Sequence, residues 1–393
     1  MKVLHTADWH VGRLLRGRSR ADEHEAVLAS IAATAAEHGV DLVIVAGDVF
    51  DTAAPSPEAE RIVYRALLDL TATGATVLVV AGNHDSERRL QAVAPLLELG
   101  RVITRGSFAR PDEGGVIEVS SRDGTETALV AALPFLSQRH VVRATDLMES
   151  DAADHGVAYA DRIRRLVAAL TQRFRGDTVN LVAAHCMVDG GTLGGGERSG
   201  HTVFEYSVPA TIFPGTAHYV ALGHLHRRQM LPGACPIYYS GSPLQLDFGE
   251  GENEPSVVVV DASAGRPAAV TSAPVAGGRR LLTVRGTLAD LRGPAGATVR
   301  SDDHVRAVVR EPFRVGLADE VRDLFPNCVD VIVERPATDD DRGRMPERAG
   351  RTPHELFGQY LAEQGVDDER LVALFDELFE LAGGGAEGAE GAG

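Results

Sequence analysis

The sequence predicts a layered α/β fold over roughly its first 275 residues. Short apolar runs alternate there with amphipathic stretches, and this alternation is typical of strands covered by helices. Two helix-like segments, near residues 22–38 and 56–73, separate the first three apolar runs. Five runs are rich in Val, Ile and Leu and stop abruptly at a glycine or a polar residue, as buried strands do: VLHTAD, DLVIVAGD, TVLVVAGNHD, NLVAAH and HYVALGHLH.

The remainder of the chain is predicted to form smaller parts joined by linkers. VVVVDAS is the expected last strand of a first domain over residues 1–275, and a Pro-, Ala- and Gly-rich stretch follows it. HVRAVVRE and VDVIVER are predicted strands around the helix-like LADEVRDLF in a small unit over residues 279–338. After a polar linker, the sequence TPHE predicts a helix start and a helical segment over residues 352–382. Residues 383–393 are mostly Gly and Ala, and we expect them to be disordered.

The net charge of −17 limits the functions that the chain can have. A protein that coats nucleic acid unaided neutralises phosphates with Lys and Arg. Any DNA contact here is therefore expected to be local, metal-centred or shared with a partner. Arg13, Arg16, Arg18 and Arg20 form one dense basic segment, which is either a solvated loop or a phosphate contact.

Nothing in the sequence indicates a membrane protein or a secreted one. The start, MKVLHTADWH, lacks the basic and apolar regions of a signal peptide, and no apolar run approaches a membrane span of about 18 residues. Cys186, Cys235 and Cys328 have no C-x-x-C spacing, so neither disulfides nor a thiolate metal site is expected. We therefore expect a cytoplasmic protein with no membrane contact.

Polar side chains that can bind metals follow each of the five predicted strands. DWH, GDVFD, GNHD, AAH and GHLH stand at these strand ends. Ligands in open α/β sheets gather beyond the carboxyl ends of the strands, so we expect the five loops to converge. The candidate ligands are Asp8, His10, Asp48, Asn83, His185, His224 and His226.

This set of side chains fits a site with two divalent metals. Such a site needs a bridging carboxylate and a nearly symmetric set of other ligands. Asp48 is the expected bridge. Asp8, His10 and His226 would complete one metal, and Asn83, His185 and His224 the other. Four imidazoles with two carboxylates and an amide oxygen suit manganese, iron or zinc better than calcium or magnesium, and we favour Mn²⁺.

Taken singly, each motif is more often a loop residue or a core histidine than a ligand, and only their joint occurrence favours a metal site. His84 is surplus to the seven ligands, so we expect it to protonate the leaving oxygen. Asp85 beside it either holds that imidazole in the useful tautomer or caps a helix.

The five motifs, in this order, resemble the calcineurin-like metallophosphoesterases. HTADWHVGR, VAGDVFDT, VAGNHDSERRL and YSGSPLQLDFGE are similar to a narrower group within them, the SbcD nuclease subunits of bacterial SbcC-SbcD complexes. The resemblance implies a layered β-sandwich flanked by helices, a small α+β capping domain over residues 279–338, and C-terminal helices. It also implies Mn²⁺-dependent cleavage of DNA, as a duplex-end exonuclease and a single-strand or hairpin endonuclease. A homodimer working with an SbcC-type ATPase in DNA repair, recombination and replication is implied as well.

Two other functions stay open at this point. A small-molecule or nucleotide phosphodiesterase could use the same metals, but it would have little use for residues 280–382. A binding module that has lost catalysis would normally show damaged ligands, whereas all seven are present here.

The C-terminal segment carries an apolar stripe at helical spacing. Its members are Leu371, Leu374, Phe375, Leu378 and Phe379. On a segment joined by a polar linker, such a stripe either binds the ATPase partner, as we expect, or packs on its own domain.

Overall fold

The computed structural model describes residues 1–137, 152–197 and 207–334, together with residues 357, 358, 361, 370–372, 374 and 375. Two units are distinguished, Met1–Glu334 and Arg335–Gly393. None of the described helices is long and apolar enough to cross a membrane. The predicted linker, the tail, Leu378 and Phe379 lie outside the described residues.

The first unit contains a six-stranded sheet that begins with the N-terminal strand. Its order is β12-β11-β1-β2-β3-β4, with β1 to β4 parallel and β11 and β12 antiparallel to their neighbours. The strands are β1 (Lys2–Thr6), β2 (Leu42–Val45), β3 (Thr76–Val80), β4 (Val102–Arg105), β11 (Ser256–Ser263) and β12 (Arg266–Pro274). The first three predicted strands and VVVVDAS are thus confirmed.

A second six-stranded sheet holds the other two predicted strands. Its order is β5-β6-β7-β8-β10-β9, with β6, β7, β8 and β10 parallel. The strands are β5 (Val116–Ser120), β6 (Thr127–Leu133), β7 (Val179–His185), β8 (Tyr219–Gly223), β9 (Gln229–Leu231) and β10 (Ile237–Tyr239).

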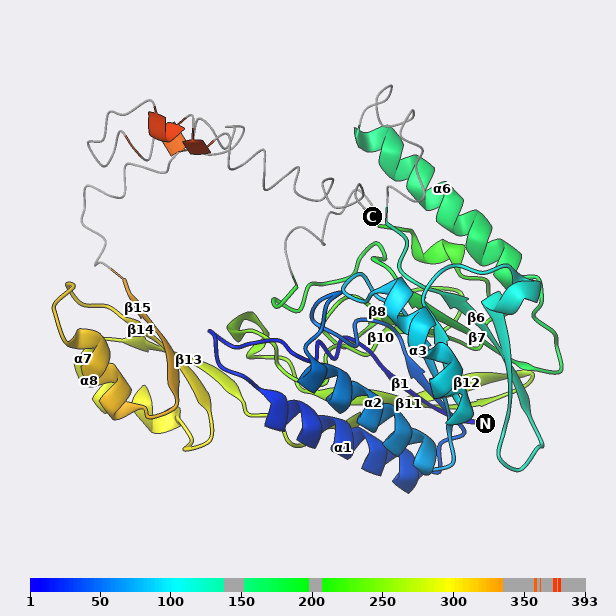
Figure 1. Ribbon diagram of the computed structural model, residues 1–393, viewed down its shortest axis with the longest axis horizontal. Coiled ribbons are helices and arrows are strands. Elements are labelled where there is room, and N and C mark those ends of the chain that lie inside the picture. The colour runs from blue at the N-terminus through cyan, green and yellow to red at the C-terminus, as the bar shows by residue number, and fades with distance from the viewer. Residues whose placement is uncertain are drawn as a thin grey trace. The chain divides into compact units, whose positions relative to one another are not determined.

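The two sheets pack face to face, and helices cover their outer faces (Figure 1). Ile44 and Leu78 of the first sheet share a core with Val130 and Leu181 of the second. The covering helices are α1 (Ala21–His38), α2 (Pro57–Ala72) and α3 (Glu87–Leu99) on the first sheet and α6 (Ala152–Thr171) on the second. Strands buried on both faces need apolar residues at every position, which explains the uninterrupted apolar runs and confirms the layered sandwich flanked by helices.

Local sequence signals fix the ends of the covering helices. Ser56 caps α2 by accepting a hydrogen bond from the Ala59 amide, and Pro57 occupies the first turn, where its missing N–H costs nothing. Helix α1 ends at Gly39, which has φ of 62° and is therefore in the left-handed region that glycine tolerates.

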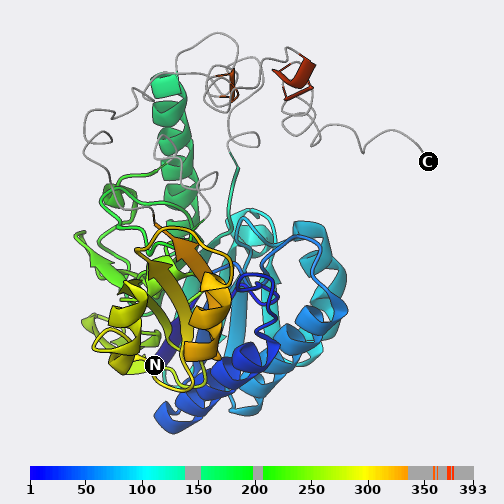
Figure 2. The same cartoon turned by 90° about the vertical axis from the view of Figure 1, so that its left-hand side faces the viewer.

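A third, all-parallel sheet follows the sandwich in the first unit. It runs β13 (Leu281–Gly286), β14 (His304–Val309) and β15 (Cys328–Val333), and α7 (Leu288–Arg292) and α8 (Leu317–Leu324) pack on it. Figure 2 shows it in yellow to orange. Both predicted strands and the helix between them are present. Its treatment as a separate capping domain stays a prediction.

The basic segment after the first strand joins the third sheet to the sandwich. Arg16 forms an ion pair with Asp330 at 2.9 Å, and Arg18 donates to the Cys328 carbonyl at 3.1 Å. Arg20 is buried and pairs with Glu23 at 2.7 Å. Arg16 and Arg18 are exposed, as expected for a solvated loop, although each also contacts a protein group, whereas Arg20 is buried.

Candidate metal centre

All seven predicted ligands lie where the carboxyl ends of the two sheets meet. Asp8 and His10 follow β1, Asp48 follows β2 and Asn83 follows β3, all in the first sheet. His185 ends β7, and His224 and His226 follow β8, in the second sheet. The sheet ends touch directly, because His185 Nδ1 donates to the Ala46 carbonyl at 2.8 Å.

One cluster contains Asp8, His10 and His226. Their candidate ligand atoms all lie within 4.8 Å of one another, and the three side chains are buried. The Nε2 atoms of His10 and His226 are 3.1 Å apart. We call this cluster position one.

A second cluster surrounds the amide of Asn83. Its Oδ1 lies 3.0 Å from His185 Nε2 and 3.0 Å from His224 Nδ1. We call this cluster position two.

Asp48 lies between the two positions. Its Oδ2 is 3.5 Å from His10 Nε2 in position one and 3.5 Å from His185 Nε2 in position two. Such a placement is the one that a bridging carboxylate requires.

The buried charges of the cluster fit divalent cations. Burial raises the pKa of Asp8 to about 7, and burial together with Asp85 and Asp8 raises the pKa of Asp48 well above its usual value. Burial and the neighbouring His224 hold the pKa of His185 well below its usual value, so this imidazole is neutral. The Nδ1 atom of His185 donates to the Ala46 carbonyl, so its Nε2 atom can only accept. This Nε2 faces Asn83 Oδ1, which is also an acceptor. A cation would satisfy both atoms and ionise the carboxylates.

The backbone is strained where it presents these side chains. Asp8, His10, Asp48 and His224 have φ of 54°, 46°, 53° and 111°. A non-glycine residue in this region costs on the order of 1–3 kcal/mol, and such residues concentrate at functional sites. Neighbouring glycines permit the close approach of the loops, since a Cβ on Gly82 would lie 2.1 Å from Asp48 Oδ1 and one on Gly47 2.2 Å from His185 Nδ1.

His84 and Asp85 lie beside the cluster but have different partners. The His84 ring is close enough to His10 and Asp48 to form a candidate ligand group with them, and its Nδ1 lies 2.7 Å from the carbonyl oxygen of Asp51. The hydrogen bonds described for the Asp85 carboxylate come from backbone amides, those of Gly82 at 2.8 Å, Phe50 at 3.1 Å and Val49 at 3.4 Å. The roles of His84 and Asp85 stay predictions.

Two glutamates that the sequence analysis did not select contact His226. Glu250 Oε1 accepts from His226 Nδ1 at 2.7 Å, and Glu197 Oε1 accepts from the His226 backbone amide at 2.9 Å. Burial alone would lower the pKa of His226, but the carboxylates of Glu250, Asp8 and Glu197 outweigh it and raise that pKa. The other site residues were identified because they directly follow predicted strands, and neither glutamate does. Glu250 ends the motif YSGSPLQLDFGE, which was used only for its resemblance to a known family.

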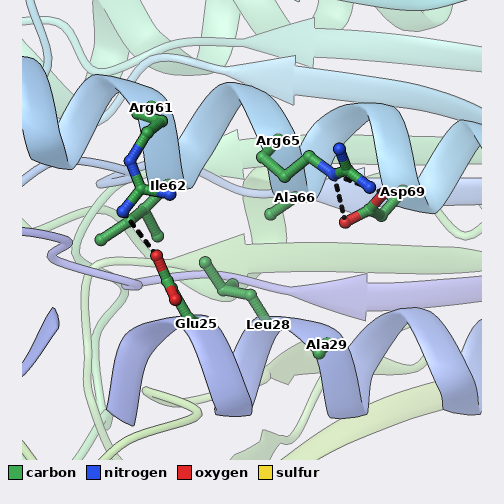
Figure 3. A pocket seen from close by; sticks show the side chains of 8 residues that line it. All are labelled: Glu25, Leu28, Ala29, Arg61, Ile62, Arg65, Ala66 and Asp69. Atoms are coloured by element: carbon green, nitrogen blue, oxygen red, sulfur yellow. Dashed lines mark hydrogen bonds and ion pairs between the residues drawn. The ribbon is translucent and has the colours of Figure 1, made fainter. Parts of the chain in front are cut away.

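A surface hollow of about 450 Å³ lies elsewhere, between α1 and α2 (Figure 3). Its charged residues pair with one another, Arg61 with Glu25 at 2.6 Å and Arg65 with Asp69 at 3.0 Å. None of the predicted site residues lines it. We therefore assign the chemistry to the polar cluster and not to this hollow.

Comparison with known proteins identifies the family. The model of the calcineurin-like phosphoesterase family matches residues 1–228. The SbcD subunit of the nuclease SbcCD from Bacillus subtilis is 37% identical over 389 residues, which cover 96% of this chain and 97% of that protein. The corresponding SbcCD proteins from Escherichia coli K12 and Rhodobacter capsulatus are 32% and 37% identical, covering 74% and 67% of this chain and 72% and 67% of theirs. The chain therefore belongs to the calcineurin-like phosphoesterases and, within them, to the family of SbcD proteins of the nuclease SbcCD.

Proposed function

We propose that this protein is a metal-dependent DNA nuclease that works with an SbcC-type ATPase in break processing, replication and recombination. The observation that carries the chemistry is the single Asp48 oxygen that lies 3.5 Å from one histidine of each position. The named relatives are nuclease subunits of SbcCD complexes, and they support the substrate and the partner. Exonuclease action on duplex ends and endonuclease action on single strands or hairpins are part of the proposal.

The ligands proposed for the metals are the seven predicted residues. Asp8, His10 and His226 would hold one divalent cation, Asn83, His185 and His224 the other, and Asp48 both. Two cations held there would activate a water molecule and offset the charge that develops on the phosphate. The four imidazoles favour Mn²⁺ over Mg²⁺, which prefers oxygen ligands.

His84 is proposed to assist the leaving group. The Asp51 carbonyl accepts from its Nδ1 at 2.7 Å, so the ring presents Nε2 for proton transfer. A protonated His84 would give its Nε2 proton to the departing oxygen of the DNA backbone. The Asp85 carboxylate would hold the loop that carries His84, through its hydrogen bonds from Gly82 and Phe50.

The partner contact is proposed to involve the C-terminal segment at residues 352–382. Leu371 and Leu374 are 39% and 48% exposed, and Phe357 stacks on Phe375 with ring centroids 4.2 Å apart. Exposed leucines at helical spacing suit a docking helix. Replacing both by Asp should prevent association with the ATPase, whereas Asp at Leu96 and Leu99, exposed on α3 with the same spacing, should not. Equal binding of both variants would favour packing of the stripe on its own domain.

A homodimer, a cytoplasmic location and a capping role for residues 279–338 complete the proposal. The free cysteines Cys186, Cys235 and Cys328 agree with a reducing compartment. The close attachment of the third sheet through Arg16 and Arg18 agrees with a sheet that helps to position DNA beside the cluster.

One assay tests the activity directly. The purified protein, with and without its ATPase, should cleave labelled duplex, hairpin and single-stranded DNA in Mn²⁺ and less well in Mg²⁺. Hydrolysis of bis-p-nitrophenyl phosphate and cyclic nucleotides with every DNA left intact would show that the protein is a small-molecule phosphodiesterase instead.

A further inference from the structure

Glu250 forms a buried contact on the side of His226 that faces away from the other ligands. Its Oε1 accepts from His226 Nδ1 at 2.7 Å, and the Nε2 of the same ring lies 3.1 Å from His10 Nε2. The second oxygen of Glu250 accepts from the Leu246 amide at 2.8 Å. The ring of His226 is therefore oriented with Nε2 facing the other candidate ligands of position one.

Gly195 and Gly196 pack closely against the segment that carries this carboxylate. A Cβ on Gly196 would lie 1.8 Å from Glu250 Oε1, and one on Gly195 would lie 2.6 Å from the Gly249 carbonyl. Glu250 is 1% exposed. Arg13 ties the loop of these glycines to the segment after β1 by donating to the Gly196 carbonyl at 2.9 Å.

The rings of His226 and His185 are supported by different groups. In position one, the ring of His226 donates to the carboxylate of Glu250. In position two, the ring of His185 donates to the neutral carbonyl of Ala46. The backbone amides do not separate the positions, because that of His226 donates to Glu197 and that of His224 to Asp8. A carboxylate bound to the far nitrogen makes an imidazole a better ligand and adds negative charge near the cation, whereas a carbonyl orients the ring without adding charge.

We propose that Glu250 is a positioning residue that tightens metal binding at position one by supporting His226. The inference rests on the proposed two-metal site and goes beyond it, because it assigns a supporting role to a side chain that is not itself a ligand. The charge of Glu250 acts through His226, so the residue needs no contact with the substrate.

The test is the affinity of the metal-free protein for Mn²⁺, measured by titration calorimetry. The Glu250→Gln variant keeps the size of the side chain and removes its charge, and losses from such supporting groups are roughly 10- to 100-fold in metal affinity. The matched control is Glu252→Gln, two residues away on an exposed side chain, which should bind as the wild type does. Equal affinities for the Glu250→Gln variant and the wild type would overturn the proposal.

Two background variants locate the effect. Asn83→Ala weakens position two, so in that background Glu250→Gln should lower the affinity of the remaining metal by the same factor. His10→Ala weakens position one, and there Glu250→Gln should change little. A loss of equal size in both backgrounds would mean that Glu250 supports the whole cluster and not position one.

Stability and activity controls keep these outcomes separate. If Glu250→Gln lowers the melting temperature of the metal-free protein, the Glu250→Asp variant is used to test the positioning role. Asp keeps the negative charge but is too short to make the 2.7 Å contact with His226. Unchanged Mn²⁺ affinity of that variant in the Asn83→Ala background would overturn the positioning role. If the wild type cleaves DNA and Glu250→Gln binds Mn²⁺ normally, the role of Glu250 is refuted and the proposed function stands. If the wild type binds Mn²⁺ but does not cleave DNA, the proposed substrate is refuted and the role of Glu250 stands.

Discussion

The Nδ1 atom of His84 lies 2.7 Å from the backbone carbonyl oxygen of Asp51. A carbonyl can only accept, so Nδ1 carries the hydrogen and Nε2 is the nitrogen that can gain or give up a proton. The backbone amide of His84 donates to Asp48 Oδ1 at 2.9 Å, which holds the same residue against the proposed bridging carboxylate. His84 is thus fixed at both its backbone and its ring.

Replacing His84 by Ala should slow DNA cleavage while leaving the metals bound. A general acid contributes roughly 10²- to 10⁴-fold in rate, and seven other ligands remain. The loss should be smaller for bis-p-nitrophenyl phosphate, whose leaving group is stable without a proton. Rates on both substrates and metal content by mass spectrometry test this, with His38→Ala at the end of α1 as the control. Loss of metal, or equal impairment on both substrates, would make His84 a ligand or a structural residue.

Replacing Asp48 by Ala should remove both metals. Each cation would lose a ligand, and the two would repel each other without the shared negative charge. Asp48→Asn separates this effect from collapse of the loop, because its side-chain oxygen can still accept from the His84 amide. Both variants should bind far less Mn²⁺ than Asp177→Ala, which changes an exposed carboxylate. Two equivalents of metal on Asp48→Asn would show that Asp48 is not the bridge.

The sequence predicted the strands and the convergence of the polar residues at their ends because both follow from local patterns. Uniform apolar runs identify buried strands, and the polar residues at their ends then fall at one place, as Asp8 and His224 do. The existence of two separate sheets could not be derived from these runs, since an apolar run does not show which strand will pair with it; only the resemblance implied a sandwich. Glu250 was missed because it approaches His226 through tertiary packing across 24 residues of chain.

The basic segment shows a second limit of sequence reasoning. Four arginines at close spacing look alike, but Arg16 and Arg18 meet the third sheet whereas Arg20 is buried against Glu23. The partners of Arg16 and Arg18 lie far away in the chain, so charge patterning alone could not separate a structural arginine from a phosphate contact.

Replacing Gly82 by Ala should disturb the metal cluster although it adds one methyl group. The new Cβ would lie 2.1 Å from Asp48 Oδ1 and 2.4 Å from the Asp48 backbone nitrogen, so the backbone itself must move. Overpacking of this kind costs about 1–3 kcal/mol. We expect a lower melting temperature and a loss of bound Mn²⁺, whereas Gly176→Ala, with open space around its Cβ, should match the wild type. Normal Mn²⁺ binding by the Gly82 variant would show that the loop is more tolerant than its packing indicates.

Glu23 forms the centre of the joint between the sandwich and the third sheet. Its carboxylate binds Arg20 at 2.7 Å, His304 of β14 at 2.9 Å and the Arg279 amide at 2.8 Å. Burial would raise the pKa of this carboxyl, but the hydrogen bonds from Arg20 and His304 outweigh it and hold the pKa well below its usual value. The ionised carboxylate therefore stabilises the folded protein.

Replacing Glu23 by Gln should destabilise this joint in a pH-dependent manner. Removing one partner of a buried pair leaves Arg20 uncompensated and costs roughly 3 kcal/mol at neutral pH. Because the folded pKa is lowered, the stabilisation is fully present above the unfolded value of 4.5 and is lost as the pH falls below it. Denaturant unfolding should show a large difference from wild type at pH 7 that shrinks below pH 4.5, and amide exchange at pH 7 should rise in β14 and not in β2. Glu25→Gln on the same helix breaks only the exposed pair with Arg61 and should cost less than about 1 kcal/mol. A Glu23 effect that is as small as this control, or that is independent of pH, would show that the joint is held by its apolar contacts and not by the carboxylate.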